Sequence, residues 1–400
     1  MKKRTIKLLK GIAIVCVTIL IIELIYIFYL LQGKSIYFDG INSVINVDNG
    51  YVSVGSNNNN DKYYEKAKIT KYDGDKVKEF EKIYNKGYNG VFFDVIEDQE
   101  KNLIAVGSFE SNDKDHSEGN RVGLIVKYDK DGNILYENSF KVLDNSKFTS
   151  IALTNDGYVV TGQSVYDNMK VGLSLDGGAI VIKYDKDLKM TWMKNYGDSK
   201  TGCYNDVLIY DNYIYTVGVT DSIVGIISKY DMNGELVKSV RYDNTDNLGF
   251  TGIDYFNGRI LVSGAKKNDT DINALLIKYN FDLELRKEVV YEGENLERFN
   301  QFVVDKHNNV ILVGTSAKVD DKSSGDKVNV YVHDGLIGKY DENLEKVSVV
   351  LYGDDRDDYF TDVVISNNNY LVSGYSSYED GSYLSKFITY SDALKTLGVE

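Results

Sequence analysis

Short runs of alternating or continuous apolar residues, separated by turn residues, follow one another along the chain from about residue 40 onward. The clearest example is the stretch 148–197, which holds four such runs separated by turn residues at 155–157, an irregular middle, and turn residues at 185–187. Alternation with period two and β-branched content predict β-strands, and the turn residues between them predict antiparallel hairpins. The stretch is therefore predicted to form one four-stranded sheet, with strands a to d in chain order.

Three sets of residues show that this unit occurs seven times. The first set is a glycine that ends a small run in strand b: Gly55, Gly107, Gly162, Gly218, Gly264, Gly314 and Gly374. The second is a Lys-Tyr-Asp triplet, or a related one, at the end of strand c, centred on Tyr72, Tyr128, Tyr184, Tyr230, Tyr279, Tyr340 and Tyr390. The third opens strand a: Ile41, Phe92, Phe148, Tyr204, Phe250, Phe299 and Phe360. The glycines are on average about 53 residues apart, a spacing typical of an array of supersecondary units.

Seven such units without helical periodicity predict an all-β fold, a seven-bladed β-propeller of four-stranded antiparallel blades. A linear solenoid is the alternative. Its end units normally carry polar caps, whereas the first and last units here keep their strand-b glycines, which favours a closed ring. We expect the tyrosine of each triplet to pack between blades with its hydroxyl pointing outward. The aspartate after it should bond the backbone of the turn between strands c and d.

These motifs resemble the secreted bacterial β-propeller repeats, in which a blade carries W-x-K-x-Y-G, an acidic residue, T-x-D-G-G-Y-x-x-x-G and I-x-K-x-D. The closest match spans 154–197, with Trp192 opening the first motif and Asp206 as the acidic residue. The resemblance covers roughly residues 41–400. It implies a propeller fold and an extracytoplasmic location, and it brings no catalytic residues to this chain.

The N-terminus predicts a membrane anchor. Basic residues in 1–11 precede an apolar run at 12–31, which at about 1.5 Å per residue spans a bilayer core of roughly 30 Å. The positive-inside rule places the tail in the cytoplasm and the remainder outside the cell membrane. A cleaved signal peptide is the alternative, but the run is longer than an h-region and lacks a small-residue cleavage site. Glu23 within the run is a candidate contact with a partner helix.

The predicted organisation is thus a basic tail (1–11), a transmembrane signal-anchor helix (12–31), a short linker (32–40) and a propeller ectodomain (41–400). The chain has a net charge of −14, and the ectodomain is still more acidic because the tail is basic. Such a surface disfavours nucleic acid and favours cations or basic partners. Cys203 is the single cysteine outside the predicted membrane segment, so we expect no intrachain disulfide there.

The connections between strands predict one rim of the ring as a binding face. Turns from a to b and from c to d share one rim and are short, whereas the b to c and d to a connections share the other rim and include 108–121, 163–178 and 315–334. Insertions on one rim are typical of a binding face. The candidate binding residues there are Glu110, Asp113, Asp115, Glu118, Asp320, Asp321, Asp326, Asp354, Asp355, Asp357 and Asp358. Carboxylates of this kind suit calcium, but no complete calcium-binding loop is present, and we expect neither a metal nor another cofactor.

The ring axis is the second candidate region. The residue two positions after the strand-a anchor is small or polar in every unit: Ser43, Asp94, Ser150, Asp206, Gly252, Gln301 and Asp362. These residues predict a hydrated channel, in which Asp94, Asp206 and Asp362 are the candidate catalytic carboxylates of a polysaccharide hydrolase or lyase. Sequence motifs of other enzyme classes are absent. The favoured function is therefore a membrane-anchored module that binds a protein or a cell-wall glycan through its long-loop rim, with no catalytic residues.

Overall fold

The computed structural model describes residues 39–58, 64–111, 121–141, 145–165, 178–196, 202–220, 224–242, 247–268, 271–319, 331–353, 356–366, 369–378 and 382–391. Within these residues the chain forms six four-stranded antiparallel sheets and one three-stranded sheet. In every sheet the strands pair in chain order. The prediction of seven antiparallel blades is confirmed.

Each sheet is one blade, and its innermost strand comes first. Blade 1 consists of β1 (Asp39–Val47), β2 (Gly50–Asn57), β3 (Lys66–Asp73) and β4 (Lys78–Tyr84), and blade 2 of β5 (Tyr88–Glu97), β6 (Leu103–Glu110), β7 (Arg121–Tyr128) and β8 (Ile134–Phe140). Blade 3 consists of β9 (Asn145–Thr154), β10 (Gly157–Val165), β11 (Gly178–Asp185) and β12 (Met190–Asn195), and blade 4 of β13 (Cys203–Tyr210), β14 (Tyr213–Val219), β15 (Gly225–Asp231) and β16 (Leu236–Arg241). Blade 5 consists of β17 (Asn247–Phe256), β18 (Arg259–Asn268), β19 (Asp271–Tyr279) and β20 (Leu285–Tyr291), and blade 6 of β21 (Leu296–Val304), β22 (Val310–Val319), β23 (Tyr331–Tyr340) and β24 (Lys346–Tyr352). Blade 7 consists of β25 (Asp358–Ser366), β26 (Asn369–Ser377) and β27 (Tyr383–Thr389).

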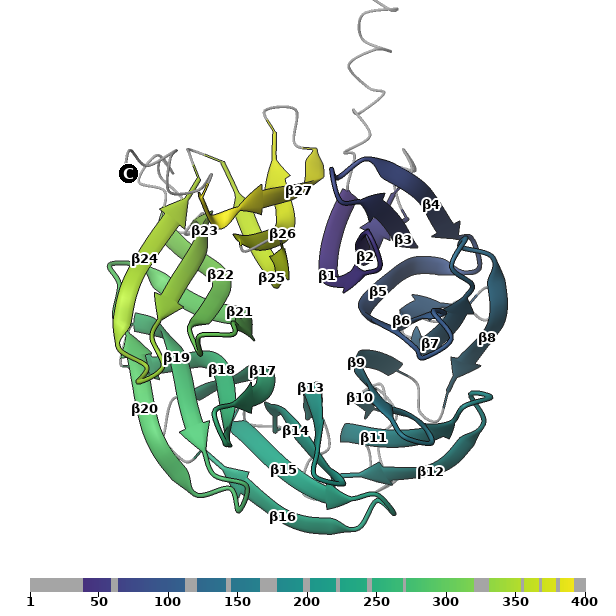
Figure 1. Cartoon of the computed structure of the whole chain (residues 1–400), viewed down its shortest axis with the longest axis horizontal. Helices are drawn as coiled ribbons and strands as arrows, with labels where there is room; N and C mark the ends of the chain where they lie inside the picture. Colours follow the sequence, from purple (N-terminus) through teal and green to yellow (C-terminus); the bar gives the residue numbers. More distant parts are fainter. Residues whose placement is uncertain are drawn as a thin grey trace, which may run out of the picture. The chain divides into compact units, whose positions relative to one another are not determined.

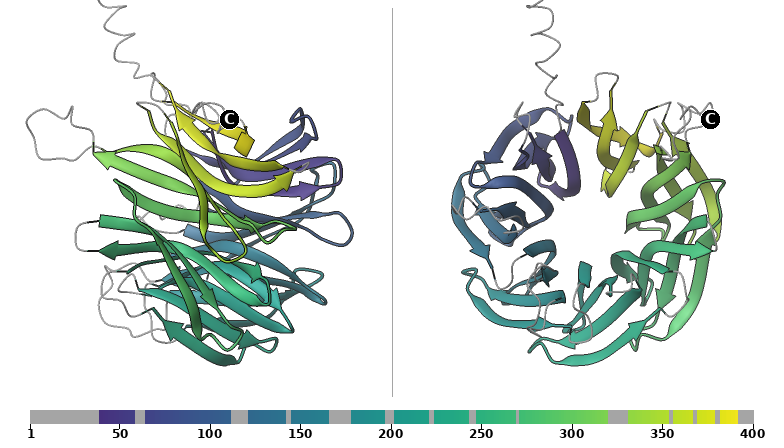
Figure 2. Two further views of the ribbon diagram at one scale, coloured as in Figure 1. Left: turned by 60° about the vertical axis from the view of Figure 1, so that its left-hand side comes forward. Right: turned by 180° about the vertical axis from the view of Figure 1, so that it is seen from behind.

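The blades stand in a closed ring around an axis, with β1, β5, β9, β13, β17, β21 and β25 innermost (Figure 1). Figure 2 shows the ring turned by 60° and from behind; in the view from behind, the last blade (yellow) stands next to the first blade (purple). Direct hydrogen bonds join the last blade to the first: Thr361 Oγ1 donates to Ile41 O over 2.8 Å, and Asn46 Nδ2 donates to Ile365 O over 2.9 Å. A ring is therefore correct, and the solenoid alternative is wrong.

Two of the three repeated residue sets pair directly across the sheet. The strand-a anchors lie opposite the strand-b glycines, as in Phe92↔Gly107 and Phe360↔Gly374, and every anchor is at most 1% exposed. A Cβ atom on any of these glycines would lie between 1.8 and 2.4 Å from the carbonyl oxygen of the residue before the anchor. Glycine is required because only a residue without a side chain allows this approach of two backbones.

The triplet residues behave partly as expected. Asp73, Asp129, Asp185, Asp231 and Asp341 accept hydrogen bonds from the backbone N–H groups two and four residues on, which confirms their role in the c to d turns. The tyrosine rings meet the strand-a anchor of their own blade edge to face, at 86° for Tyr128 and 87° for Tyr230. Both hydroxyls are buried, so the expected outward direction is wrong at these two positions.

The connections differ between the two rims as predicted. On the short-turn rim, a to b connections such as β13 to β14 and c to d connections such as β7 to β8 are brief. On the long-loop rim, strand residues extend into the segments predicted as loops, because β22 continues to Val319 and β23 starts at Tyr331. The chain enters the ring on this rim, since the start of β1 pairs with the end of β2, Asp39↔Asn57.

The predicted tail, anchor and most of the linker, with Glu23, lie outside the described residues. Within the described part of the chain, no helix is long and apolar enough to cross a membrane. Cys203 is buried and free.

Candidate functional site

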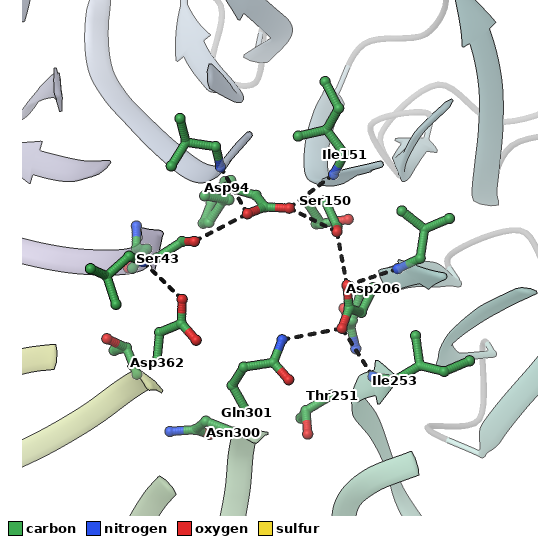
Figure 3. A pocket seen from close by; sticks show the side chains of 18 of the residues that line it. Ser43, Asp94, Ser150, Ile151, Asp206, Thr251, Ile253, Asn300, Gln301 and Asp362 are labelled. Carbon is green, nitrogen blue, oxygen red and sulfur yellow. Dashed lines mark hydrogen bonds between the residues drawn. The ribbon is translucent and has the colours of Figure 1, made fainter. Parts of the chain in front are cut away.

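The polar positions predicted along the axis do meet there. Ser43, Asp94, Ser150, Asp206, Gln301 and Asp362 line a cavity of about 380 Å³ at the centre of the ring (Figure 3). Gly252 occupies the seventh position, where a Cβ atom would lie 2.4 Å from Oε1 of Gln301. The side chain of Gln301 therefore uses the space that glycine leaves in the neighbouring blade.

A β-bulge positions these side chains in each blade. The pairing of the innermost strand with its neighbour shifts by one residue between the anchor and the axial position, as at Phe92/Asp94 and Tyr204/Asp206. The same shift occurs in the other five blades. A bulge leaves one residue unpaired and turns the next side chain away from the regular ladder. Here it aims the axial side chains into the cavity.

The carboxylates satisfy the backbone N–H groups that follow the bulges. Asp94 accepts from its own neighbour Val95 over 2.8 Å and from Ile151 of blade 3 over 2.9 Å. Asp206 accepts in the same way from Val207 and from Ile253 of blade 5. Asp362 accepts from Val363 and from Val44 of blade 1. Each aspartate thus ties two blades together.

The seventh N–H group belongs to Phe302, and it donates to Gln301 Oε1 over 2.9 Å. Three aspartates and one glutamine therefore satisfy seven backbone donors, one in each blade. The blades with serine or glycine at the axial position need no acceptor of their own, because the aspartate of the preceding blade supplies it. Buried backbone donors are costly to leave without a partner, so this ring of bonds, the axial belt, stabilises the inner strands.

Serine hydroxyls join the aspartates to one another. Ser150 Oγ lies 2.9 Å from Asp94 Oδ2 and 2.8 Å from Asp206 Oδ1. Ser43 Oγ donates to Asp94 Oδ1 over 3.1 Å. A hydroxyl has one hydrogen, so both contacts of Ser150 are hydrogen bonds only when one of the two carboxyls is protonated.

The electrostatics agree with a shared proton. Burial raises the pKa of Asp94, and burial together with the Asp94 charge raises the pKa of Asp206 to about 6. Burial also raises the pKa of Asp362 to about 7, against the opposing effect of its two backbone donors. The shifts favour the protonated form of these carboxyls relative to a free aspartate, and each carboxyl accepts from backbone donors on two blades.

The residues inserted at six of the seven bulges form a second set of bonds between blades, which the sequence analysis did not predict. Asn205 Nδ2 donates to Phe250 O over 2.7 Å, and Thr251 Oγ1 donates to Phe299 O over 2.7 Å, so each side chain reaches the anchor carbonyl of the next blade. Four more junctions have the same bond, from Asn42, Thr149, Asn300 and Thr361. Phe93 occupies this place in blade 2 and has no donor to offer.

The predicted rim residues are dispersed in so far as the structure describes them. Glu110 lies at the end of β6 and contacts Asn89 over 2.9 Å and Arg121 over 3.6 Å. Asp357 and Asp358 lie where blade 6 passes into blade 7. The other predicted rim acids lie outside the described residues: Asp113, Asp115, Glu118, Asp320, Asp321, Asp326, Asp354 and Asp355.

Asp357 and Asp358 contact different partners. Asp357 Oδ1 lies 3.0 Å from His333 Nδ1, and the hydroxyl of Tyr359 lies 2.7 Å from the same nitrogen. Asp358 is buried, accepts from Ser376, and lies 3.3 Å from Lys386 Nζ. The two carboxylates therefore do not form one acidic site.

A pocket of about 210 Å³ lies beside Asp358 on the long-loop rim, between blades 6 and 7. The Lys386 ammonium lies 4.4 Å from the ring centre of Tyr352, and the Arg356 guanidinium lies 5.7 Å from that of Tyr378. Ser377 adds a hydroxyl to the lining. We call this the rim pocket. It combines ring faces, cations and hydroxyls, which is the mixture of groups found in ligand sites.

The described residues contain no group of three or more His, Cys, Asp or Glu side chains that could hold a metal ion. The axial aspartates, Asp357 and Asp358 are among the described residues, whereas most of the other predicted rim acids lie outside them.

Comparisons with known proteins return the fold alone. No family model matches the sequence, and no curated protein matches it. Among solved structures, the chain is similar to the WD40 β-propeller domain of Doa1, with a TM-score of 0.49 and 11% identity over 89% of this chain and 96% of that one. It is equally similar to Sqt1 from Chaetomium thermophilum, with a TM-score of 0.49 and 11% identity over 90% and 98%. A third similar structure is BBS1N in complex with ARL6DN, with a TM-score of 0.49 and 11% identity over 90% and 94%.

Proposed function

We propose that this protein is a membrane-anchored, extracytoplasmic β-propeller that binds a protein or a cell-wall glycan through its long-loop rim. The observation that carries the proposal is the rim pocket, which lies on the rim where the connections differ most in length from blade to blade. Uniform tight turns on the other rim leave less room for blade-specific contacts. Variable loops on a rigid scaffold are the usual place for a binding site.

The entry point of the chain bears on where such a partner lies. Residues before Asp39 join the propeller at the long-loop rim. A linker at 32–40 reaches at most roughly 30 Å when fully extended. With an anchor at 12–31, a linker of this length holds the propeller within short reach of the membrane. The partner is then membrane-proximal, and Glu23 provides a candidate contact with the membrane helix of that partner.

The test compares the wild-type protein with the double variant Arg356→Ala/Tyr378→Ala in crosslinking and co-purification from the native cell envelope. We expect the variant to lose the partner while its thermal unfolding is unchanged, because Tyr378 is 44% exposed and Arg356 lies in a connection. Tyr136→Ala is the matched control, since Tyr136 is 37% exposed on the outer strand β8. Capture of the same partner at wild-type yield by the double variant, and by a variant lacking 320–330, contradicts the rim assignment.

A second candidate function, a polysaccharide hydrolase or lyase, is supported by the raised pKa values of Asp206 and Asp362 in the axial cavity. Perturbed carboxyls in a cavity are a general mark of active sites. In the axial belt the same carboxyls accept hydrogen bonds from backbone N–H groups of two blades. Because this structural role accounts for their burial, we prefer binding over catalysis as the function. Release of reducing ends from wall polysaccharides, lost in Asp206→Asn, would favour catalysis.

A further inference from the structure

Three aromatic rings form a nearly parallel group on the short-turn rim, between blades 4 and 5. Tyr210 ends β13, Tyr255 lies near the end of β17, and Phe281 lies between β19 and β20. The Tyr210 ring centre is 4.9 Å from that of Tyr255 at an interplanar angle of 22°, and 4.5 Å from that of Phe281 at 4°. The third pair, Tyr255 and Phe281, is 6.4 Å apart at 18°. We call these three residues the aromatic ledge.

Two residues of the ledge, Tyr210 and Phe281, are held by contacts with the protein, whereas Tyr255 is exposed. Lys229 Nζ donates to the backbone carbonyl of Phe281 over 3.1 Å, and Tyr210 and Phe281 pack against the buried core of blades 4 and 5. Tyr255 remains 39% exposed. Rings that are held in place before binding lose little conformational entropy on contact, and tyrosine offers a large amphipathic face for few rotatable bonds.

Charges of both signs lie around the ledge. Two acids and three bases lie in and beside its turns, Asp211, Asp282, Lys229, Lys238 and Arg259, whereas Asp254 lines the axial cavity. Two of the bases are already engaged, because Lys229 Nζ lies 4.0 Å from the ring centre of Tyr213 and Lys238 Nζ donates to Asp282 O over 2.6 Å. A strongly charged partner therefore meets no cluster of free opposite charges among these residues. A neutral, hydroxylated ligand suits these surroundings better.

We propose that the aromatic ledge is a carbohydrate-contact surface, on which a pyranose ring stacks against Tyr255. A pyranose presents C–H groups on its face and hydroxyls around its edge. The face matches an aromatic ring, and the edge matches exposed polar side chains such as Asp211 and Asn257 in the adjoining turns. The ledge lies on the rim opposite to the entry of the chain, so it is separate from the long-loop rim of the proposed function, and its binding chemistry does not rest on that function.

The test uses a substitution that the fold already contains. Asn46 in blade 1 and Tyr255 in blade 5 occupy equivalent positions. Each pairs with the second residue of the following strand, which is Tyr51 in β2 and Ile260 in β18. We therefore compare the wild-type protein with Tyr255→Asn, Tyr255→Phe and the control Tyr136→Ala. The probes are chito-oligosaccharides and cello-oligosaccharides in calorimetric titrations, together with sedimentation on insoluble polymers of the same types.

We expect the wild type to bind at least one probe, and Tyr255→Asn to bind it roughly tenfold more weakly or not at all. Tyr255→Phe should bind like the wild type, because it keeps the ring. Thermal unfolding of every variant is measured alongside. Absence of binding to all probes by the wild type, or equal binding by a folded Tyr255→Asn variant, overturns the proposal. Arg356→Ala/Tyr378→Ala should keep oligosaccharide binding, so failure of the rim pocket and failure of the ledge are told apart.

Discussion

The axial belt predicts a graded loss of stability that depends on how many backbone donors each side chain satisfies. Asp206→Ala leaves the N–H groups of Val207 and Ile253 without their acceptor. Gln301→Ala leaves one such group, that of Phe302. Ser43→Ala leaves none, because the N–H of Val44 donates to Asp362. Each of the three positions lies directly after the bulge of its blade.

A buried donor without a partner costs about 1–3 kcal/mol. The free energy of unfolding should therefore fall by about 2–6 kcal/mol in Asp206→Ala, about 1–3 in Gln301→Ala and less than about 1 in Ser43→Ala. Urea denaturation at one fixed pH, followed by circular dichroism, measures all three with a common m-value. The reasoning is refuted if Ser43→Ala costs as much as Asp206→Ala, or if Asp206→Ala is as stable as the wild type.

Three further predictions concern the same region. Because burial raises the pKa of Asp206 to about 6 and that of Asp362 to about 7, the stabilising effect of their protons is fully present below the unfolded value of about 3.9 and is lost as the pH rises through the folded values. The unfolding temperature should thus fall between about pH 4 and pH 7, and less steeply in Asp362→Asn; a steeper fall in the variant contradicts the assignment. Phe93→Asn should stabilise the protein by about 0.5–1.5 kcal/mol by adding the missing bond to the next anchor carbonyl, and no gain in the urea midpoint argues against a continuous second ring. Gly252→Ala should destabilise, since the new Cβ lies 2.4 Å from Gln301 Oε1, and Gln301→Ala in the same chain should recover part of the loss.

The fold could be predicted from the three repeated residue sets because their members contact one another within one blade. Gly107 and Phe92 are cross-strand partners about 15 positions apart, so the spacing of glycine and aromatic residue along the chain reflects the length of one hairpin. The polar axis was predictable for a similar reason. The position after the bulge is the one place in strand a where every blade has a small or polar residue.

Contacts between blades were not predictable in the same way. The bonds from Asn205 to Phe250 and from Asp206 to Ile253 join residues about 45 positions apart, and both exist only because each inner strand is bulged. The signal was present as an alternation of Asn and Thr directly after the anchors, with Phe93 as the exception. The prediction of an outward hydroxyl is wrong for Tyr128 and Tyr230 because their rings pack against the anchor of their own blade. In blade 4 that anchor is Tyr204, whose hydroxyl lies 2.8 Å from that of Tyr230.

The acidic character of the chain also required the structure for its interpretation. Carboxylates crowd the rim in the sequence, yet Glu110 contacts Arg121, Asp357 contacts His333, and Asp358 contacts Lys386. The aromatic ledge had no sequence signal, because its three rings come from two blades and three separate turns. A surface of that kind is assembled by the ring and is visible only once the blades are in place.

The closing contacts between blades 7 and 1 show how the ring and the axial belt depend on each other. Blade 7 has three strands among the described residues. Near the axis, two hydrogen bonds join it to blade 1: the N–H of Val44 donates to Asp362, and the hydroxyl of Thr361 donates to the carbonyl of Ile41. Farther out, Ser385 Oγ donates to Asp39 Oδ2 over 3.0 Å, and Asp39 pairs with the buried Lys68. The two axial bonds repeat those at other junctions, so closure uses the same inner-strand chemistry as every other contact between blades. The axial acids serve closure, whereas the rim pocket and the aromatic ledge lie on opposite rims and take no part in it.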